Sequence, residues 1–562
     1  MSAQPQPKPL DVSRFYTHAE ITDILRSYEE RYPELASLSS IGQSYEGRDI
    51  WVLTITNQDT GGAESKPAMY IDGNIHAGEV TGSNVCLYTV DQLLTRYGND
   101  AVITQLLDNA TFYILPRVSP DGSDKYLTTP EMLRSSVRIW PYEDEDDGLV
   151  AKDIDGDGHI LQMRVKDPNG EWKISEKDPR LMVRRAPDDV SGEFYRLYTE
   201  GEIRNPRPGP IKMARSPYGL DQNRNWPANW TPTQRGAGPY PLSEPETSAL
   251  AAFVEAHPNI CIVQNYHTTG GVILRAPCIR SDSQIPQRDL AVYKAMGEIG
   301  TELTGYPCSP VYDAFPTTDE QGRRSTAGGF IEWTYEHKGI LSFSTELWDI
   351  KSRAGIERKP NDPMRGVAEE TEADGLAILA WLDKERGGKG FVEWRGFEHP
   401  QLGQVEIGGW LVKEVRQNAP SELLLDECQR NAAFSFKQAA MLPRLKIGSV
   451  EVEQVAPDLH IVRVGLVNTG YLSTNVSDQA LRSNAVKPIT VTIEGADVLL
   501  GQPKTEVGQI PGRASLAGAG RFAGRVENER MLEYLVRGNG VITVTAHSER
   551  AGTDRRSVEL DA

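Results

Sequence analysis

The sequence has little cysteine, an excess of negative over positive charge, and no long apolar run. Its five cysteines form no Cys-x-x-Cys pair and no zinc-finger spacing, which argues against a disulfide framework and a thiolate metal site. Any bound metal must therefore take histidine and carboxylate ligands. The 60 lysines and arginines are outnumbered by 79 acidic residues, which gives a net charge of −19. Nucleic acid and anionic membranes are therefore not expected as partners, because attraction to phosphate needs positive charge.

The hydropathy and length of the chain predict a globular protein of several domains. No apolar run approaches the roughly 18 residues that a membrane-spanning helix requires, and the mean hydropathy is −0.45. A length of 562 residues suggests two or three domains, since one domain usually has roughly 100–200 residues. Residues 1–10 are rich in proline and lack the apolar core of a signal peptide. The protein is therefore either cytoplasmic or exported with its leader removed, and the sequence does not decide between these.

Residues 11–388 alternate between short apolar runs and helical patterns. Thr17 and Glu20 have the spacing of a capping box, which satisfies free amides at the start of a helix. Strands that alternate with helices predict an α/β fold whose mostly parallel sheet is covered by helices. The strands are expected at 50–55, 69–71, 111–115, 261–266 and 340–343, and helices at 80–96, 243–256 and 366–384.

Beyond about residue 440 the pattern changes to short alternating runs without a long helix. Val462, Val464 and Leu466 alternate with other residues, and similar runs follow near 489–493 and 542–544. Turn residues separate these runs, which is typical of an all-β sandwich of about 120 residues. The expected boundaries are 11–388 for the α/β domain, 389–440 for a connecting hairpin and helix, and 441–562 for the sandwich.

A strongly acidic segment interrupts the α/β region. Residues 142–158 contain eight acids and one base, Lys152, within an insertion expected to span 141–210. Such a run is usually a solvated face of the protein. The insertion is therefore expected to be a surface loop.

Part of this segment resembles the first half of a calcium-binding loop. Asp153, Asp155 and Asp157 stand at positions 1, 3 and 5, and Gly158 stands at position 6. Carboxylate oxygens suit a hard cation, and the glycine permits the turn. Position 12 is Arg164 instead of the bidentate glutamate, which excludes a complete EF-hand. A partial calcium site and an acidic loop without metal both stay open.

Histidines and acids stand at the carboxyl ends of predicted strands, where sites form in sheets of this kind. His76 and Glu79 follow the strand predicted at 69–71. Their spacing can place a nitrogen and a carboxylate on one metal ion, and zinc accepts both ligand types. Catalytic zinc takes a third protein ligand, for which His267, after the run 261–266, is the best candidate.

A further acidic residue, Glu346, also stands at the end of a predicted strand. Glu346 ends the run that begins at Gly339, another predicted strand that could reach the same sheet edge. A carboxylate that is partly desolvated beside a cation is tuned for use as a general base. Taken alone, each of these residues would more often be an ordinary core or surface residue, so the interpretation rests on the whole constellation.

These residues occur together with several short motifs in a characteristic order. The motifs are His76-x-x-Glu79, Pro-Arg-Val-Ser-Pro-Asp-Gly at 116–122, Asp-Gln-Asn-Arg-Asn-Trp at 221–226, His267, Gly-Gly-Phe-Ile-Glu-Trp at 328–333, and Ser-Phe-Ser-Thr-Glu-Leu at 342–347. In this order and spacing the chain resembles the zinc carboxypeptidases of the pancreatic carboxypeptidase family, over residues 15–385. Between Gly328 and Glu346 the spacing fits that family without a gap.

This resemblance implies a zinc-dependent metallopeptidase that hydrolyses the C-terminal peptide bond of a peptide or protein with a free C-terminus. His76, Glu79 and His267 would bind the zinc ion. Glu346 would deprotonate the zinc-bound water and pass the proton to the leaving amine. The resemblance also implies a mixed sheet of the eight-stranded type, covered by helices.

The family's substrate-binding residues carry over by position. Asn223 and Arg224 would hold the terminal carboxylate of the substrate, because a planar guanidinium pairs with both oxygens at once. An arginine that stabilises the oxyanion should follow the Pro-Asp-Gly turn, and Arg134 and Arg138 both qualify. Where the family has a mobile tyrosine, this chain has Arg324, which either favours a more anionic substrate or faces solvent.

Two other functions stay open. A related zinc amidohydrolase that removes an acyl or γ-glutamyl group would use the same metal and base, so only the substrate pocket distinguishes it from a carboxypeptidase. An inactive binding protein is the second alternative, and the intact metal ligands and Glu346 argue against it. The sequence leaves open the natural substrate, the role of the sandwich and the oligomeric state.

Overall fold

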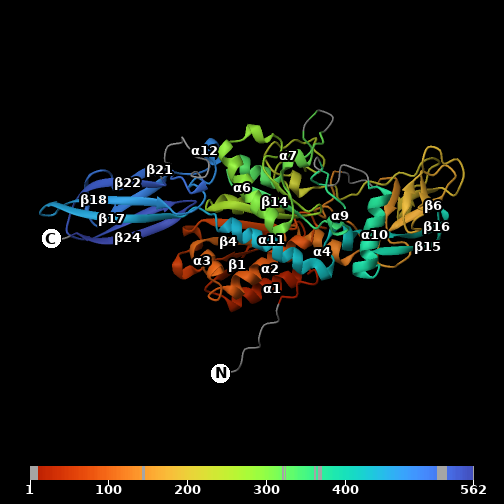
Figure 1. Cartoon of the computed structure of the whole chain (residues 1–562), viewed down its shortest axis with the longest axis horizontal. Helices are drawn as coiled ribbons and strands as arrows, with labels where there is room; N and C mark the ends of the chain where they lie inside the picture. Colours follow the sequence, from red (N-terminus) through yellow and green to blue (C-terminus); the bar gives the residue numbers. More distant parts are fainter. Residues whose placement is uncertain are drawn as a thin grey trace, which may run out of the picture.

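The computed structural model describes residues 10–141, 146–318, 322, 324–359, 362–364, 370–514 and 528–560. Figure 1 shows three parts in a row along the long axis: a β-sandwich at one end, an α/β part in the centre, and a small sheet at the other end. The acidic residues 143–145 and the beginning of the helix predicted at 366–384 lie outside the described residues.

A mixed sheet forms the middle of the central part, as predicted. Its strands are β1 Ala36–Gln43, β2 Asp49–Ile55, β3 Ala68–Gly73, β4 Thr111–Leu115, β11 Ile260–Thr268, β12 Val272–Arg275, β13 Cys308–Pro310 and β14 Leu341–Leu347. Over the described residues these eight strands are ordered β1-β2-β4-β3-β11-β14-β12-β13. Strands β4, β3, β11 and β14 are parallel, whereas the pairs β1–β2, β2–β4 and β12–β14 are antiparallel.

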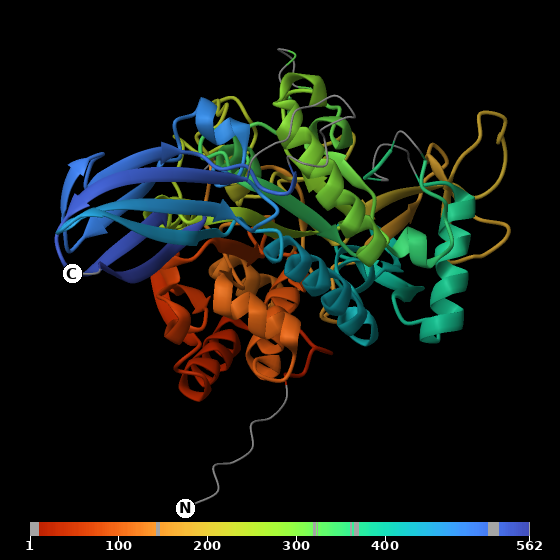
Figure 2. The ribbon, with the colours of Figure 1, turned by 60° about the vertical axis from the view of Figure 1, so that its left-hand side comes forward.

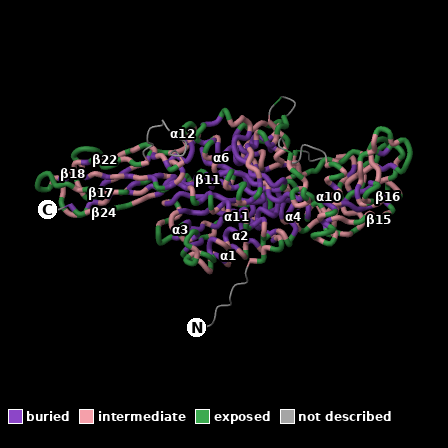
Figure 3. The backbone as a smooth tube through the Cα atoms, in the orientation of Figure 1, coloured by how far each residue is buried: buried purple, intermediate pink, exposed green. Residues whose placement is uncertain are grey.

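Helices cover both faces of this sheet because its inner strands are buried on both sides. Every residue of β3, β4 and β11 is buried. The covering helices are α1 His18–Arg31, α2 Thr81–Arg96, α3 Ala101–Asn109, α5 Pro245–Ala256, α6 Gln287–Thr304, α8 Phe330–Glu336 and α11 Leu424–Ala439. One face packs against α1, α2, α3, α6 and α11, and the other against α5 and α8. Figure 3 shows how the buried residues concentrate in this central part.

The start of the first helix agrees with the sequence. Thr17 and Glu20 form the predicted capping box at the start of α1: the Thr17 hydroxyl accepts from the Glu20 amide, and Oε2 of Glu20 accepts from the Thr17 amide at 2.8 Å. As far as the chain is described, no helix is both long and apolar enough to cross a membrane.

The insertion at 141–210 is not the bare surface loop expected from its acidity. Its described residues form the strands β5 Gly148–Ala151, β6 Gln162–Lys166, β7 Trp172–Ile174, β8 Met182–Arg184, β9 Tyr195–Thr199 and β10 Gly201–Arg204. Strands β6 to β9 join the hairpin of β15 Phe391–His399 and β16 Gly403–Trp410 in a sheet ordered β15-β16-β6-β9-β7-β8. Arg164 on β6 and Glu406, opposite it on β16, are 242 residues apart. A local sequence pattern cannot reveal such a partner.

The segment 389–440, expected as a connector, is divided between two parts of the molecule. Its hairpin belongs to the small sheet and is followed by a short π-helix at Val412–Gln417. Helix α11 then packs against α2 and α6 in the central part. The chain therefore passes through the central part once more before it enters the sandwich.

The C-terminal residues form the predicted β-sandwich. Its strands are β17 Leu445–Ala456, β18 Leu459–Asn468, β19 Ile489–Glu494, β20 Asp497–Leu500, β21 Lys504–Gly508, β22 Glu529–Arg537, β23 Gly540–Ser548 and β24 Gly552–Leu560. Within the described stretch the two sheets are ordered β17-β18-β22-β20 and β21-β19-β23-β24. Val462, Val464 and Leu466 on β18 point into the shared core, as their alternation indicates. Figure 2 turns this part toward the viewer.

The sandwich is attached to the central part around Gly339, just before β14. Ser477 Oγ donates to the carbonyl of Gly339 at 2.6 Å, and Arg550 Nη1 donates to the same oxygen at 3.2 Å. Gly339 has a φ of +59°, and a Cβ at this position would lie 2.2 Å from the Cα of Ala480. Only glycine fits here. The turn that leads into the strand carrying Glu346 therefore also forms the contact with the sandwich.

Candidate metal centre

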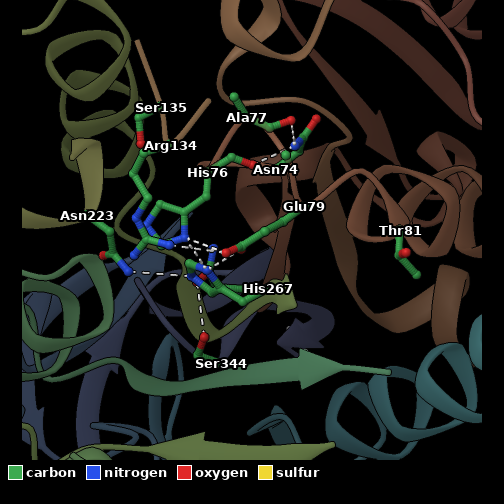
Figure 4. A network of polar contacts seen from close by, with 12 residues as sticks. Asn74, His76, Ala77, Glu79, Thr81, Arg134, Ser135, Asn223, His267 and Ser344 are labelled. Carbon is green, nitrogen blue, oxygen red and sulfur yellow. Dashed lines mark hydrogen bonds and ion pairs between the residues drawn. The ribbon is translucent and has the colours of Figure 1, made fainter. Parts of the chain in front are cut away.

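The three predicted zinc ligands lie together at the carboxyl ends of two adjacent strands. His76 and Glu79 stand in the loop between β3 and α2, and His267 stands near the end of β11. Because β3 and β11 are parallel neighbours, with Gly73 opposite Tyr266, these ends meet at one edge of the sheet. All three side chains are buried. Figure 4 shows them turned toward one another.

The donor atoms of this cluster are close enough to bind one cation. Nδ1 of His76 lies 2.9 Å from Oε1 of Glu79, and Nδ1 of His267 lies 2.8 Å from Oε2 of Glu79. The two Nδ1 atoms are 3.0 Å apart, and one donor atom from each residue fits within a spread of 4.8 Å. Two imidazole nitrogens and a carboxylate are a donor set that catalytic zinc uses. The residues therefore fit the ion that the sequence predicts.

The electrostatics of the cluster favour a cation. Burial alone would raise the pKa of Glu79, but the imidazoles of His76 and His267 hold this pKa well below its usual range. Burial alone would lower the pKa of His267, but the Glu79 carboxylate beside it raises this pKa. Glu79 is therefore negatively charged over the whole physiological range, which is the form that binds a metal ion.

A second carboxylate orients His76 from its other side. Oδ1 of Asp221 lies 3.1 Å from Nε2 of His76, which leaves Nδ1 directed at Glu79. Burial alone would raise the pKa of Asp221, but Arg134 and His76 hold it well below its usual range. Asp221 begins the motif at 221–226, yet nothing in its local sequence indicated that it contacts His76.

The structure distinguishes the two candidate arginines. Nε of Arg134 lies 3.1 Å from Oδ2 of Asp221, and Nη1 of Arg134 lies 3.4 Å from Oε1 of Glu79. Arg138 instead pairs with the fully buried Glu244, with 3.0 Å between Nε and Oε2. The Arg134 side chain is about half exposed, so a ligand can reach it. Arg134 is therefore the arginine that stands at the cluster.

The predicted base lies on the next strand. Glu346 on β14 is directly opposite His267 on β11 in parallel register, so the two side chains are neighbours on one face of the sheet. Burial raises the pKa of Glu346 to about 7; the charge of His267 opposes this shift and that of Glu79 adds to it. A carboxyl group that titrates near neutral pH can both accept and return a proton.

The predicted carboxylate-binding residues stand beside the cluster in a short 3-10 turn, Gln222–Arg224. Nδ2 of Asn223 lies 3.5 Å from Nε2 of His267. Arg224 donates to two backbone carbonyls, to Ser325 from Nε at 3.0 Å and to Asn223 from Nη1 at 2.8 Å. Among the residues that the structure describes, Arg224 forms no ion pair with a carboxylate. Its charge therefore stays available to an anionic ligand.

Arg324, at the place of the family's tyrosine, is held by other residues of the protein. Its Cζ lies 3.8 Å from the ring centroid of Tyr312, and its Nη1 donates to the carbonyl of Phe315 at 3.3 Å. The guanidinium is thus stacked on an aromatic ring, an arrangement that the sequence did not indicate. Arg323, which precedes it, lies outside the described residues.

The acidic insertion contains a second group of potential metal ligands. Oxygens of Asp153, Asp155 and Glu200 lie within 4.8 Å of one another. Glu200 is fully buried and accepts hydrogen bonds from two backbone amides at 2.8 Å each. Asp157, the third ligand expected from the sequence, instead pairs with Arg395 at 2.6 Å, and Arg395 also contacts Asp155. Glu200 therefore takes the place of Asp157 in this group.

Comparison with known proteins defines the family. The sequence profile described as zinc carboxypeptidase matches residues 21–373, which is more than half of the chain. The chain therefore belongs to the zinc carboxypeptidase family. Residues 444–559, which form the sandwich, match a profile described as a domain of unknown function.

Individual relatives are similar over part of their length. Carboxypeptidase B of Astacus astacus is 30% identical over 205 residues, which cover 36% of this chain and 59% of the relative. Carboxypeptidase A1 of Sus scrofa is 24% identical over 344 residues, which cover 60% of this chain and 62% of the relative. The structure of thrombin activatable fibrinolysis inhibitor is 18% identical, with a TM-score of 0.43, and the match covers 78% of this chain and 79% of that one. The chain thus spans about three-fifths of the length of these curated relatives.

Proposed function

We propose that this chain is a zinc-dependent carboxypeptidase that removes the C-terminal residue from a peptide or protein with a free C-terminus. One observation supports this most directly. The cluster of His76, Glu79 and His267 lies next to Glu346 on the adjacent strand and next to an arginine, Arg224, whose charge is available to an anion.

His76, Glu79 and His267 would hold the zinc ion. Zinc bound there supplies a Lewis acid that polarises the scissile carbonyl and makes a water molecule more acidic. Asp221 keeps the His76 ring in its orientation through the contact at 3.1 Å. Arg134, which contacts both Asp221 and Glu79, adds a positive charge at the place where negative charge develops on the carbonyl oxygen.

Glu346 would act as the general base. Burial raises its pKa above the usual range of a carboxyl group, which suits a group that accepts a proton from the attacking water and then gives it to the leaving amine. Glu346 stands opposite His267, so it would lie beside the metal ligands but would not itself bind the metal.

Asn223 and Arg224 would bind the terminal carboxylate of the substrate. A hydrogen bond to a charged group contributes about 1.5–3 kcal/mol, and a guanidinium can form two of them with one carboxylate. Arg224 is partly buried and is held in place by two backbone carbonyls, so its orientation is set before substrate binds.

The test compares matched peptide acids and peptide amides. Amidation of the substrate's C-terminus should nearly abolish turnover by the zinc-loaded native protein, measured as kcat/KM. Arg224→Ala should hydrolyse the free acid poorly, and amidation should then make little further difference, because the group that recognises the charge is missing. Equal rates on acid and amide with the native protein would contradict the proposal.

Two other outcomes correspond to the alternative functions. Turnover of N-acyl or γ-glutamyl amino acids, with none of blocked dipeptides, would indicate an amidohydrolase. Stoichiometric zinc without hydrolysis of any substrate in the panel would indicate a binding protein.

We further propose that Asp153, Asp155 and Glu200 form a partial calcium site. The support is a set of carboxylate oxygens within 4.8 Å of one another, which is the ligand type that calcium prefers. Calcium should raise the unfolding temperature of the native protein and have little effect on Asp153→Asn. An unfolding temperature that does not respond to calcium would identify an acidic loop without metal.

A further inference from the structure

A large cavity lies between the central part and the small sheet. Its volume is about 1920 Å³, whereas pockets for drug-sized ligands have roughly 300–1,000 Å³. One wall comes from the residues that follow α4 (Pro120–Thr128) and from the π-helix Val412–Gln417. The opposite wall comes from strands of the insertion and of the hairpin. The insertion therefore adds a cavity that the central sheet alone would not form.

Large apolar side chains that are open to solvent form part of the cavity wall, beside charged side chains from the insertion and from the π-helix. Met132, Ile139, Met213 and Val412 line it, and each of them is between 42% and 50% exposed. They come from three segments of the wall that are distant in the sequence. Apolar groups gathered at one exposed place mark a binding site more often than isolated ones do. Methionine adapts its shape to different apolar partners, which suits a site for variable side chains.

The cavity wall includes near neighbours in sequence of the residues at the metal site, although none of those residues lines the cavity itself. Three separate segments each place one residue in the cluster or in contact with it, and a second residue, one to three positions away, in the cavity wall. The pairs are Glu79 with Val80, Arg134 with Met132, and Asp221 with Tyr218. Consecutive Cα atoms are about 3.8 Å apart, so each pair spans at most about 11 Å. An extended chain rises about 3.3 Å per residue, so about three residues cover this distance.

The cavity lies on the Arg134 side of the cluster and not on the Arg224 side. Its wall includes neighbours of Arg134, but among the described residues it includes none of 222–226 and none of 324–331, the segments around Asn223 and Arg224. In the proposed function, Arg224 marks the end of the substrate, and Arg134 marks the scissile carbonyl. The cavity therefore extends from the side on which the rest of the substrate chain leaves the site.

We propose that this cavity binds an apolar segment of the peptide substrate, namely the residues that precede the scissile bond. This proposal rests on the proposed carboxypeptidase function and adds its substrate class: peptides whose C-terminal residue follows several apolar residues. The occupant is a peptide chain because the cavity continues the path of the chain whose end is held at Arg224.

The experiment compares three substrates with the same last two residues: an N-blocked dipeptide, a pentapeptide that begins with three leucines, and a pentapeptide that begins with three serines. Burial of one large apolar side chain corresponds to about a 10-fold gain in binding. The zinc-loaded native protein should therefore show kcat/KM at least about 10-fold higher on the leucine pentapeptide than on the other two.

Met213→Glu places a charge in the cavity wall at a half-exposed position. This variant should reduce the ratio of kcat/KM between the leucine and serine pentapeptides several-fold. Met531→Glu makes the same change on β22 of the sandwich, where the side chain is 61% exposed, and should leave that ratio unchanged. Ile139→Glu provides a second position in the wall and should act like Met213→Glu.

Binding provides a readout that does not depend on turnover. Fluorescence anisotropy with labelled pentapeptides and the zinc-loaded Glu346→Gln protein should show tighter binding of the leucine peptide. The addition of Met213→Glu should remove that preference.

The outcomes separate this inference from the function on which it rests. Equal kcat/KM for the dipeptide and both pentapeptides would overturn the inference while the carboxypeptidase function stands. An N-lauroyl dipeptide cleaved in preference to the leucine peptide would also overturn it and assign the cavity to an acyl chain. If no peptide were cleaved, the proposed function would fail, and equal anisotropy for the two peptides would then overturn the cavity assignment as well.

Discussion

A buried glutamate on α8 is expected to make the stability of the central part depend on pH. Glu332 lies in the first turn of α8 and is fully buried. Its Oε1 accepts a hydrogen bond from Nδ2 of Asn229, and its Oε2 accepts one from the amide of Gly328, both at 2.9 Å. Burial raises the pKa of Glu332 to about 7 from an ordinary value of 4.5, and the two hydrogen bonds offset only part of that rise.

The sign and the size of the effect follow from these two values. The folded protein binds the proton of the Glu332 carboxyl group more tightly than the unfolded chain does. The contribution of this protonated group to the free energy of unfolding is therefore fully present below pH 4.5 and is lost as the pH rises to about 7. One pKa unit corresponds to about 1.4 kcal/mol, so the loss between about pH 5.5 and pH 8.5 is about 2 kcal/mol. The side chain in Glu332→Gln cannot titrate, so this variant does not lose that stability. The difference in free energy of unfolding, variant minus native protein, should therefore rise by this amount between the two pH values.

The measurement is denaturant unfolding of the zinc-loaded proteins at both pH values, followed by tryptophan fluorescence. Other buried groups also titrate, but they contribute equally to the native protein and the variant and cancel in the difference. Glu302→Gln, at an exposed position on α6, is the matched control and should follow the native protein at both pH values. A difference between Glu332→Gln and the native protein that does not change with pH would refute the reasoning.

Three further predictions concern the metal cluster. His267→Ala should lose most of its zinc in metal analysis after dialysis, and near-stoichiometric zinc would show that the third ligand is another residue. Glu346→Gln should retain zinc and lose at least about 100-fold in kcat; activity within a few-fold of native would contradict its role as base. Asp221→Asn should bind zinc about 10- to 100-fold more weakly in chelator competition, and unchanged affinity would mean that its contact with His76 does not orient the ring.

The cluster could be predicted because its residues stand at the ends of strands that the sequence reveals. Strands β3, β11 and β14 are consecutive neighbours in the sheet, and each of them appears as a short apolar run. Parallel neighbours bring their carboxyl ends to one edge, so His76, His267 and Glu346 meet once the strand order is correct. The order itself does not follow from the runs; before the structure, only the resemblance to the family implied that these residues share one site.

Residues in irregular loops could not be placed in this way. Arg134 and Arg138 stand in a segment without helix or strand, so no periodicity distinguishes them. The two arginines differ in their long-range partners. Arg138 forms an ion pair with the buried Glu244, whereas Arg134 forms ion pairs with Asp221 and Glu79. None of these three partners is near the arginines in the sequence.

Arg164 argues against an EF-hand in the sequence, but in the fold it joins the insertion to the hairpin of β15 and β16. In the sequence it occupies the place of a calcium loop's bidentate glutamate and therefore excludes a complete EF-hand. In the structure its Nε donates to Oε2 of Glu406 at 2.9 Å across the pair β6–β16, and its Cζ lies 4.5 Å from the ring centroid of Trp394. The side chain is buried, so both contacts act with little competition from water. Because Trp394 also lines the large cavity, the contact that joins the insertion to the hairpin fixes part of the wall proposed to receive the substrate.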